Sequence, residues 1–141
     1  PDATVSVDSW ESQELSDHFR AHHDGYRRLD VPVIHQREFV LEKASESLVI
    51  HDIFQGKGEH AFEWNFHLGL YVSMQQNDLT SLTMRTDGNL VRLVFDPRLS
   101  LEVCESSFSP SYGIIVPAQS LRFTWKGIIP CTPFTFHFSL Q

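Results

Sequence analysis

Hydrophobic and polar side chains alternate along most of this chain, with a period of two residues. In the stretch 61–68, Phe62, Trp64, Phe66 and Leu68 fall on one face, while mostly polar side chains occupy the other. Such alternation is typical of a strand with one buried face, because successive side chains of a strand point to opposite faces of the sheet. The same pattern predicts further strands at 4–10, 15–26, 33–41, 48–54, 79–85, 89–95, 99–105, 121–126 and 134–140.

These stretches predict an all-β fold, an antiparallel β-sandwich of about ten strands with little or no helix. Only the segment 9–19 offers serines that could cap a helix, and because its apolar spacing is poor we favour loop or strand there. Two turns, Gly56-Lys57-Gly58 and Thr86-Asp87-Gly88-Asn89, each separate two predicted strands. We expect the strands on either side of each turn to be antiparallel neighbours.

Composition narrows the class of protein. The chain has 141 residues, of which 41% are hydrophobic and 12% aromatic, which is enough for a single domain over residues 1–141. The 18 acidic and 11 basic residues give a formal net charge of -7, which argues against a nucleic-acid binder. The apolar stretches are far shorter than the ~20 residues that cross a bilayer, so we expect no membrane segment. Because position 1 is Pro rather than Met, we expect either a processed chain or, as the preferred alternative, a piece cut from a longer polypeptide.

The two cysteines leave the redox environment open. Cys104 and Cys131 can form a disulfide only if the fold brings them together, which the sequence does not show. We favour two buried free thiols over a disulfide.

Eight histidines is a high number for this length, and several of them gather in the first half of the chain. Zinc requires three or four nitrogen, oxygen or sulfur ligands that converge in a tetrahedron. His23, Asp24 and His67 are the best trio, because His67 lies on the polar face of its predicted strand. No closely spaced pair of ligands marks the site, so histidines that bind no metal are the alternative.

A second group of candidate residues follows the histidines. Tyr26, Arg27 and Arg28 are consecutive, and Arg37 lies about one strand further along. A tyrosine can transfer protons and an arginine can hold a carboxylate with two hydrogen bonds, which suits sugars that carry uronic acids. The alternative is structural: Tyr26 would be an interface aromatic, and the arginines would pair with the abundant acidic residues.

Several short motifs occur in a fixed order over most of the chain. Together they resemble the C-terminal domain of heparinase II/III-like proteins. They are HDGYRRL at 23–29, HQR at 35–37, LVIHD at 48–52, FHL at 66–68, SPSYG at 109–113 and PCTPFT at 130–135.

The resemblance implies an antiparallel β-sandwich that follows an α/α-toroid domain in polysaccharide lyases. Related proteins are encoded with bacterial exopolysaccharide genes. Lyases of this kind act on glycosaminoglycans or alginate by β-elimination. The uronate carboxylate is neutralised, a Tyr or His removes the C5 proton, and the glycosidic oxygen leaves, which produces an unsaturated sugar. Some members bind zinc in this domain, and His23, Asp24 and His67 are the nearest counterparts. A periplasmic or cell-envelope location in a bacterium is implied.

The resemblance therefore favours an accessory β-sandwich domain that forms one wall of the cleft for an acidic polysaccharide. His22 and Tyr26 are the candidate cleft residues, and Arg27, Arg28 and Arg37 are the candidate substrate-binding residues. The main catalytic residues would lie on the toroid, so we expect the chain alone to be inactive as a lyase. The alternative is a noncatalytic carbohydrate-binding or structural module of a bacterial exopolysaccharide system.

Overall fold

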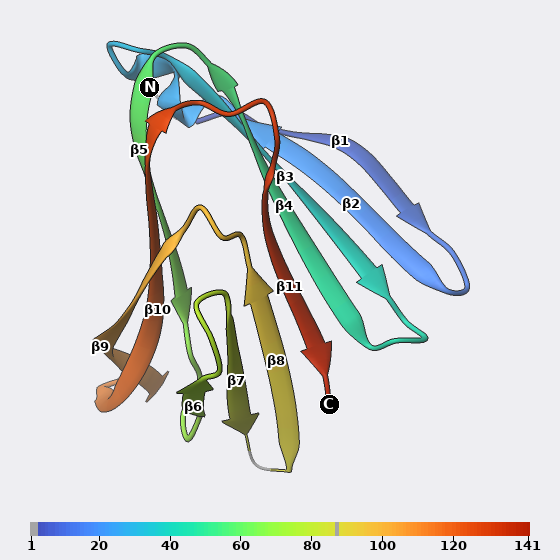
Figure 1. Ribbon diagram of the computed structural model, residues 1–141, viewed down its shortest axis with the longest axis vertical. Helices are drawn as coiled ribbons and strands as arrows, with labels where there is room; N and C mark the ends of the chain where they lie inside the picture. The colour runs from blue at the N-terminus through green and yellow to red at the C-terminus, as the bar shows by residue number, and fades with distance from the viewer. Residues whose placement is uncertain (1–2, 87) are drawn as a thin grey trace.

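The computed structural model describes residues 3–86 and 88–141, which form two facing antiparallel sheets (Figure 1). The larger sheet has eight strands in the order β1-β2-β3-β4-β11-β8-β7-β6, and the smaller has three in the order β5-β10-β9. This confirms the predicted all-β sandwich. The elements are β1 (Val5–Ser12), β2 (Ser16–His23), the 3-10 turn η1 (Gly25–Arg28), β3 (Val33–Glu42), β4 (Ser47–Gly56), β5 (Glu59–His67), β6 (Ser73–Gln76), β7 (Ser81–Thr86), β8 (Asn89–Phe95), β9 (Ser100–Ser111), β10 (Ile114–Ile128) and β11 (Phe134–Leu140).

The core lies where the two sheets overlap. Phe134 and Phe136 of β11 are fully buried, as is Phe123 of β10 on the opposite sheet. Their rings meet between the layers, with Phe123 and Phe136 centroids 5.1 Å apart in an edge-to-face arrangement. Aromatic pairs of this geometry add to the free energy gained from burial, so a ladder of phenylalanines holds the two sheets together.

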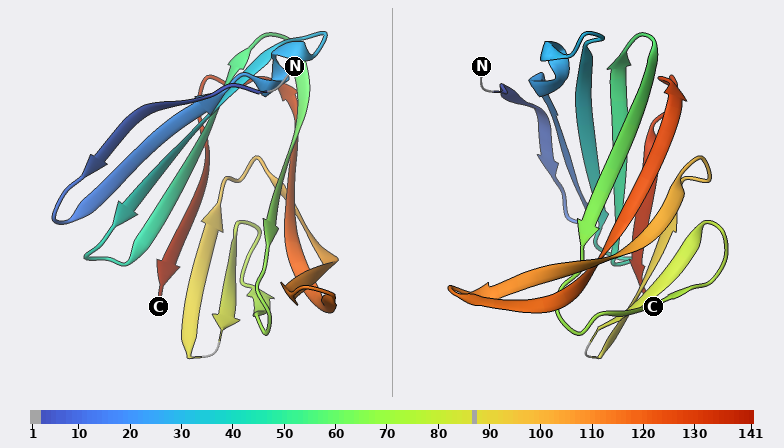
Figure 2. Two further views of the ribbon diagram at one scale, coloured as in Figure 1. Left: turned by 180° about the vertical axis from the view of Figure 1, so that it is seen from behind. Right: turned by 90° about the vertical axis from the view of Figure 1, so that its left-hand side faces the viewer.

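The larger sheet extends beyond the smaller one. One row of paired residues crosses four of its strands on the inner face, from Trp10 through Phe19 and Phe39 to Ile50. Exposure falls along this row: Trp10 is 64% exposed, Phe19 and Phe39 are half-buried, and Ile50 is 5% exposed. Figure 2 shows why, since β1, β2 and β3 spread away from the smaller sheet. We call the inner face of β1–β3 the uncovered half of the larger sheet.

The turn at Gly56-Lys57-Gly58 corrects one prediction. The strands on either side of it, β4 and β5, belong to different sheets and are not paired. A Cβ atom on Gly56 would lie 2.7 Å from the Pro32 carbonyl oxygen, and Gly58 has a φ of 83°. Glycine therefore allows the close backbone approach at position 56 and the left-handed backbone conformation at position 58 that this connection between the sheets requires. The sequence alone does not distinguish such a connection from a hairpin.

The other turn is a hairpin, as predicted: β7 and β8 are paired, with Thr86 opposite Asn89. Asp87 lies outside the described residues. The segment 9–19 forms the end of β1 and the start of β2, so strand and turn were the correct expectation. The predicted strand 15–26 is too long, because the chain enters η1 after Asp24.

The cysteines are free, as expected, but they are not both buried: Cys104 is half-buried and Cys131 is exposed. The preference for two buried thiols was therefore wrong. Within the described ranges, no helix is long and apolar enough to span a membrane.

Candidate functional site

A buried carboxylate lies at the centre of the site. Asp52 is on β4 between Ile50 and Phe54, at a position whose side chain points into the sandwich, and it is fully buried. Its Oδ1 accepts hydrogen bonds from His35 Nε2 and from Arg37 Nε, the latter at 2.7 Å. Its Oδ2 accepts from Arg37 Nη2 at 2.8 Å. The fork of Arg37 thus compensates the buried charge, which would otherwise be strongly destabilising.

The fourth donor to Asp52 comes from the other sheet. Trp64 of β5 donates its indole N–H to Asp52 Oδ2 at 2.9 Å, and both side chains are buried. This hydrogen bond is a polar link between the two layers. Beside it, the rings of Phe54 on β4 and Phe62 on β5 stack across the layers with their centroids 3.8 Å apart. The site is therefore held rigidly from both sheets.

A chain of two histidines leads outward from Asp52. Because His35 Nε2 donates to Asp52, neutral His35 accepts through Nδ1, and His23 Nε2 donates to it at 3.2 Å. His23 Nδ1 then accepts the backbone N–H of Gly25 at 3.3 Å. The hydrogen-bond network assigns one tautomer to each ring, and it connects the buried carboxylate to the start of η1.

The electrostatics of this network favour a neutral His23 and an ionised Asp52. Burial by itself raises the pKa of the Asp52 carboxyl, but hydrogen bonds from His35 and Arg37 outweigh it and lower the pKa below 3.8. Burial lowers the pKa of His23 below 6.5, and the nearby His35 lowers it further, while Asp24 opposes the shift. His23 and Asp52 therefore each bind a proton less readily in the folded chain than in the unfolded chain.

The η1 turn carries the exposed polar groups of the site. Tyr26 packs edge-on against His23, with ring centroids 5.0 Å apart, and is 42% exposed. Arg27 and Arg28 follow it in the same turn and are both exposed. Asp24, just before the turn, accepts the backbone N–H of Thr4 at 2.7 Å. The turn is thus fixed at its base and presents its last three side chains to solvent.

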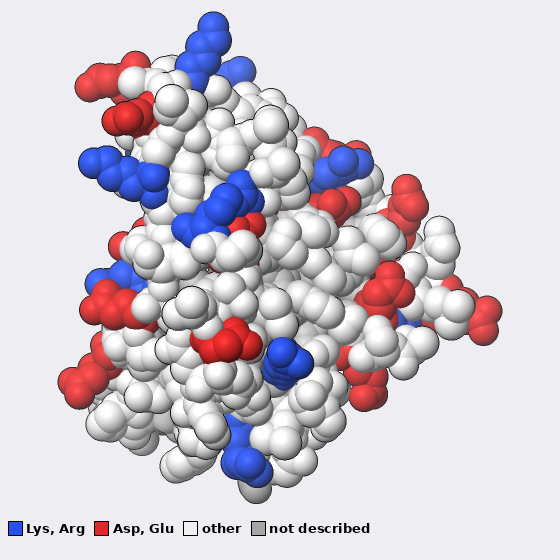
Figure 3. All heavy atoms as spheres, viewed as in Figure 1, with Lys and Arg blue, Asp and Glu red and all other residues white. Residues whose placement is uncertain are grey.

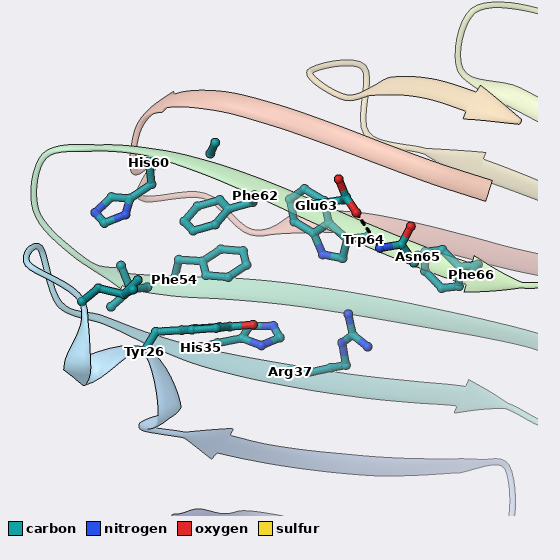
Figure 4. A pocket seen from close by; sticks show the side chains of 13 residues that line it. Tyr26, His35, Arg37, Phe54, His60, Phe62, Glu63, Trp64, Asn65 and Phe66 are labelled. Atoms are coloured by element: carbon teal, nitrogen blue, oxygen red, sulfur yellow. Dashed lines mark hydrogen bonds between the residues drawn. The ribbon is translucent and has the colours of Figure 1, made fainter. Parts of the chain in front are cut away.

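A cavity of about 490 Å³ lies beside η1, between β3 and β5 (Figure 4). Aromatic rings of the two sheets form its floor. Arg37 and Glu63 are the charged residues at its wall, and Arg37 is already paired with Asp52. The residues that line it are Tyr26, Leu29, Val33, His35, Arg37, Phe54, His60, Ala61, Phe62, Glu63, Trp64, Asn65 and Phe66.

The predicted site residues do not all gather here. Tyr26, Arg27 and Arg28 share η1, whereas Arg37 lies deeper, with its fork used by Asp52. His22 lies on the outer face of β2, where its Nδ1 is 2.7 Å from Asp8 Oδ1. The two arginines and the tyrosine thus form the accessible part of the set.

The zinc trio does not fit a metal in this arrangement. Both ring nitrogens of His23 and one oxygen of Asp24 have hydrogen-bond partners. His67 ends β5, while His60, near the other end of that strand, lines the η1 cavity. In residues 3–86 and 88–141, no three His, Cys, Asp or Glu side chains converge as a metal site would require. Zinc binding by this trio stays a prediction that the geometry does not support.

Sequence reasoning missed the residues at the centre of the site. His35 and Asp52 entered only as letters in motifs, and Trp64 only as a core residue. A usable signal was present: His35, Arg37 and Asp52 all stand at positions of the alternation that point inward. Charged side chains at such positions are rare unless paired, so each predicts a partner nearby.

Comparisons with solved structures identify similar folds. The heparan sulfate lyase HepC from Pedobacter heparinus has a TM-score of 0.79 at 15% identity, over 96% of this chain and 21% of that one. A heparinase III gene product has a TM-score of 0.78 at 12% identity, over 97% and 21%. A crystal structure of heparinase III has a TM-score of 0.74 at 13% identity, over 95% and 20%. This chain therefore spans about a fifth of the length of these proteins.

A search of curated proteins finds no match. The family described as "Heparinase II/III-like, C-terminal" matches residues 2–133, almost the whole chain. The motifs, the two-sheet topology and this match agree, and the chain belongs to the heparinase II/III-like C-terminal family.

Proposed function

We propose that this chain is the accessory β-sandwich domain of a polysaccharide lyase, and that η1 forms part of the wall of a cleft for a uronic-acid glycan. The observation that carries the proposal is the contrast between the base and the tip of η1. At the base, His23 is tied to Asp52 through His35. At the tip, Arg27 and Arg28 are exposed.

A preorganised pair of arginines suits an acidic glycan. Guanidinium groups hold carboxylates and sulfates with paired hydrogen bonds, and a rigid turn loses little conformational entropy when they bind. Tyr26 adds an aromatic face with a hydroxyl beside them. Figure 3 shows acidic and basic side chains interspersed over one face of the molecule, so a local cluster rather than overall charge would attract the glycan.

Arg37 fits a positioning role better than the substrate-binding role predicted from the sequence. Its Nε and one Nη are committed to Asp52, and its side chain is 33% exposed. Arg37 therefore neutralises the buried carboxylate and positions the network, while Arg27 and Arg28 contact the glycan. His22 is paired with Asp8 on the other face of the sheet and takes no part in this wall.

The β-elimination itself would be carried out by residues of the parent protein outside this chain. The similar solved structures are heparan sulfate lyase and heparinase III, and this chain spans about a fifth of each. We therefore expect residues 1–141 alone to release no unsaturated product from heparan sulfate. A rise in the ultraviolet absorbance of the unsaturated sugar with this chain alone would contradict that division of roles.

Calorimetric titration with a heparan sulfate oligosaccharide tests the wall. The Arg27→Ala/Arg28→Ala variant is expected to bind about tenfold more weakly than the wild type, a loss of ~1.4 kcal/mol. Binding by the wild type should also weaken as salt is added, because these contacts are exposed charges. The matched control is Arg85→Ala/Arg92→Ala, which removes the same charge from exposed positions on β7 and β8. Equal losses in both variants, or no saturable binding by the wild type, would contradict the proposal.

A further inference from the structure

The smaller sheet has an open edge next to the site. In the described part of the chain, β5 pairs with β10 and with no other strand, so its second edge has no partner. An edge strand directs alternate N–H and C=O groups away from its neighbour, and those groups need hydrogen-bond partners. Native sandwiches usually cover such an edge or protect it from pairing with other strands. The free edge of β5 is nine residues long.

The cavity beside η1 follows that edge. The six consecutive residues from Ala61 to Phe66 all line it. Since successive side chains of a strand point to opposite faces, a cavity that touches all six lies along the edge of the strand rather than over one face. Figure 4 shows β5 on one side of this space and β3 with η1 on the other.

The floor beyond this edge is the uncovered half of the larger sheet. A second groove there is lined by Phe19, Phe39 and neighbouring residues, and it shares His35 and Arg37 with the first cavity. The two hollows therefore adjoin at His35 and Arg37. Val7 and Trp10, on the same inner face, are 62% and 64% exposed. Aromatic and aliphatic side chains that stand open on the inner face of a sandwich indicate a missing layer.

The charge of this space argues against a polyanion as its occupant. Arg37 is neutralised by Asp52, and the other charged residue of the wall is Glu63, whose Oε1 lies 3.8 Å from Arg122 Nε. An acidic glycan would lose solvation there without a free cation to bind. A peptide strand with apolar side chains fits better, since it would supply both hydrogen bonds for the edge and cover for the rings.

We propose that polypeptide preceding Pro1 in the parent protein adds β-strands to the smaller sheet, starting at the free edge of β5, and so covers Phe39, Phe19 and Trp10 in turn. The match is to the C-terminal part of its family, and the similar solved structures are about five times as long as this chain. Additional polypeptide on the N-terminal side is therefore available in such proteins. The described chain also begins at the end of the sandwich that carries η1 and the start of β5 (Figure 1).

The first test measures, in the parent protein, how accessible the uncovered half of the larger sheet is to a small reagent. Val7→Cys and Val94→Cys variants are labelled with iodoacetamide, and each site is quantified by peptide mass spectrometry. In the sandwich alone, Val7 is the more exposed position, at 62% against 37% for Val94 on the outer face. The proposal predicts labelling at position 7 at least about tenfold slower than at position 94. Labelling at position 7 that is as fast or faster overturns it.

The second test identifies the occupant. A benzophenone attached through Asn65→Cys, at an exposed position of β5, is photolysed in the parent protein. A crosslink to a peptide that precedes Pro1 is the expected result. Crosslinks to a second copy of the protein, detected by isotope mixing, or only to peptides within residues 1–141 overturn the proposal. Neither test depends on glycan binding, so failure of the η1 proposal and failure of this one are distinguishable.

Discussion

The two halves of the larger sheet carry similar side chains but have different surroundings. On the inner face, Phe136 of β11 lies under the smaller sheet and is fully buried, whereas Phe19 of β2 is half-buried. Both positions belong to the same row of paired residues. Alternation along a strand therefore tells which way a side chain points, but the second layer decides whether water is excluded from it. The Asp52 network lies at the boundary between the two halves.

The largest expected effect is in the covered half. Phe136→Ala should lower the free energy of unfolding of chain 1–141 by about 4 kcal/mol, because it leaves a cavity among the buried rings. Phe19→Ala, the same change in the uncovered half, should cost less than about 1.5 kcal/mol. Urea unfolding followed by fluorescence measures both. Equal losses would contradict the difference between the halves.

At the boundary, Asp52→Asn should cost about 3 kcal/mol, since it leaves the Arg37 guanidinium without its counter-charge. The Arg37→Leu/Asp52→Leu double variant should recover most of that loss, because it removes both charges together. Asp17→Asn, which breaks an exposed pair with Lys43, serves as the control and should leave the midpoint nearly unchanged. A double variant less stable than Asp52→Asn would count against a neutralising role for Arg37.

The same network makes stability depend on pH. In the folded chain the pKa values of His23 and Asp52 lie below their ordinary 6.5 and 3.8, so the unfolded chain binds more protons in both windows. Stability should therefore fall as the pH drops below 6.5, and fall again below 3.8. His23→Gln should remove the first loss, and His18→Gln should keep it. Unfolding midpoints between pH 7.5 and 3 measure these losses, and an unchanged midpoint at pH 7 and 5 would contradict the first.

The smallest effect is expected at the outermost position of the uncovered half. Trp10→Ala should change the stability of chain 1–141 by less than about 1 kcal/mol, because the ring is 64% exposed and packs edge-on against the half-buried Phe19. In the parent protein the same substitution should cost more, since the inferred layer of strands would cover the ring. Equal small effects in both proteins would contradict cover by that layer.

Much of the fold follows from alternation alone. The strands that alternate cleanly, such as β5 and β11, were predicted within one or two residues. The short strand β6, Ser73–Gln76, was missed because it has no apolar alternation, and β9 and β10 extend past their predicted ends into an exposed hairpin. The assignment of strands to the two sheets was harder to predict. A glycine turn is compatible both with a hairpin and with the connection by which β4 and β5 pass from one sheet to the other.

The candidate site was only partly predictable. Tyr26, Arg27 and Arg28 are close in sequence, and the structure keeps them together in η1. The contact between His35 and Asp52 depends on the register of β3 against β4, where Arg37 rather than His35 stands directly opposite Asp52. Register of this kind is set by the whole sheet, so the sequence indicated inward charges but not which ones would meet.

Steady-state kinetics of the parent protein on heparan sulfate test most directly whether η1 contacts the glycan. The Arg27→Ala/Arg28→Ala variant is expected to raise KM about tenfold with kcat unchanged, because it removes binding that is equal in the ground and transition states. An unchanged KM, or the same rise in KM for Arg85→Ala/Arg92→Ala, would contradict a role for η1 as the wall of the cleft.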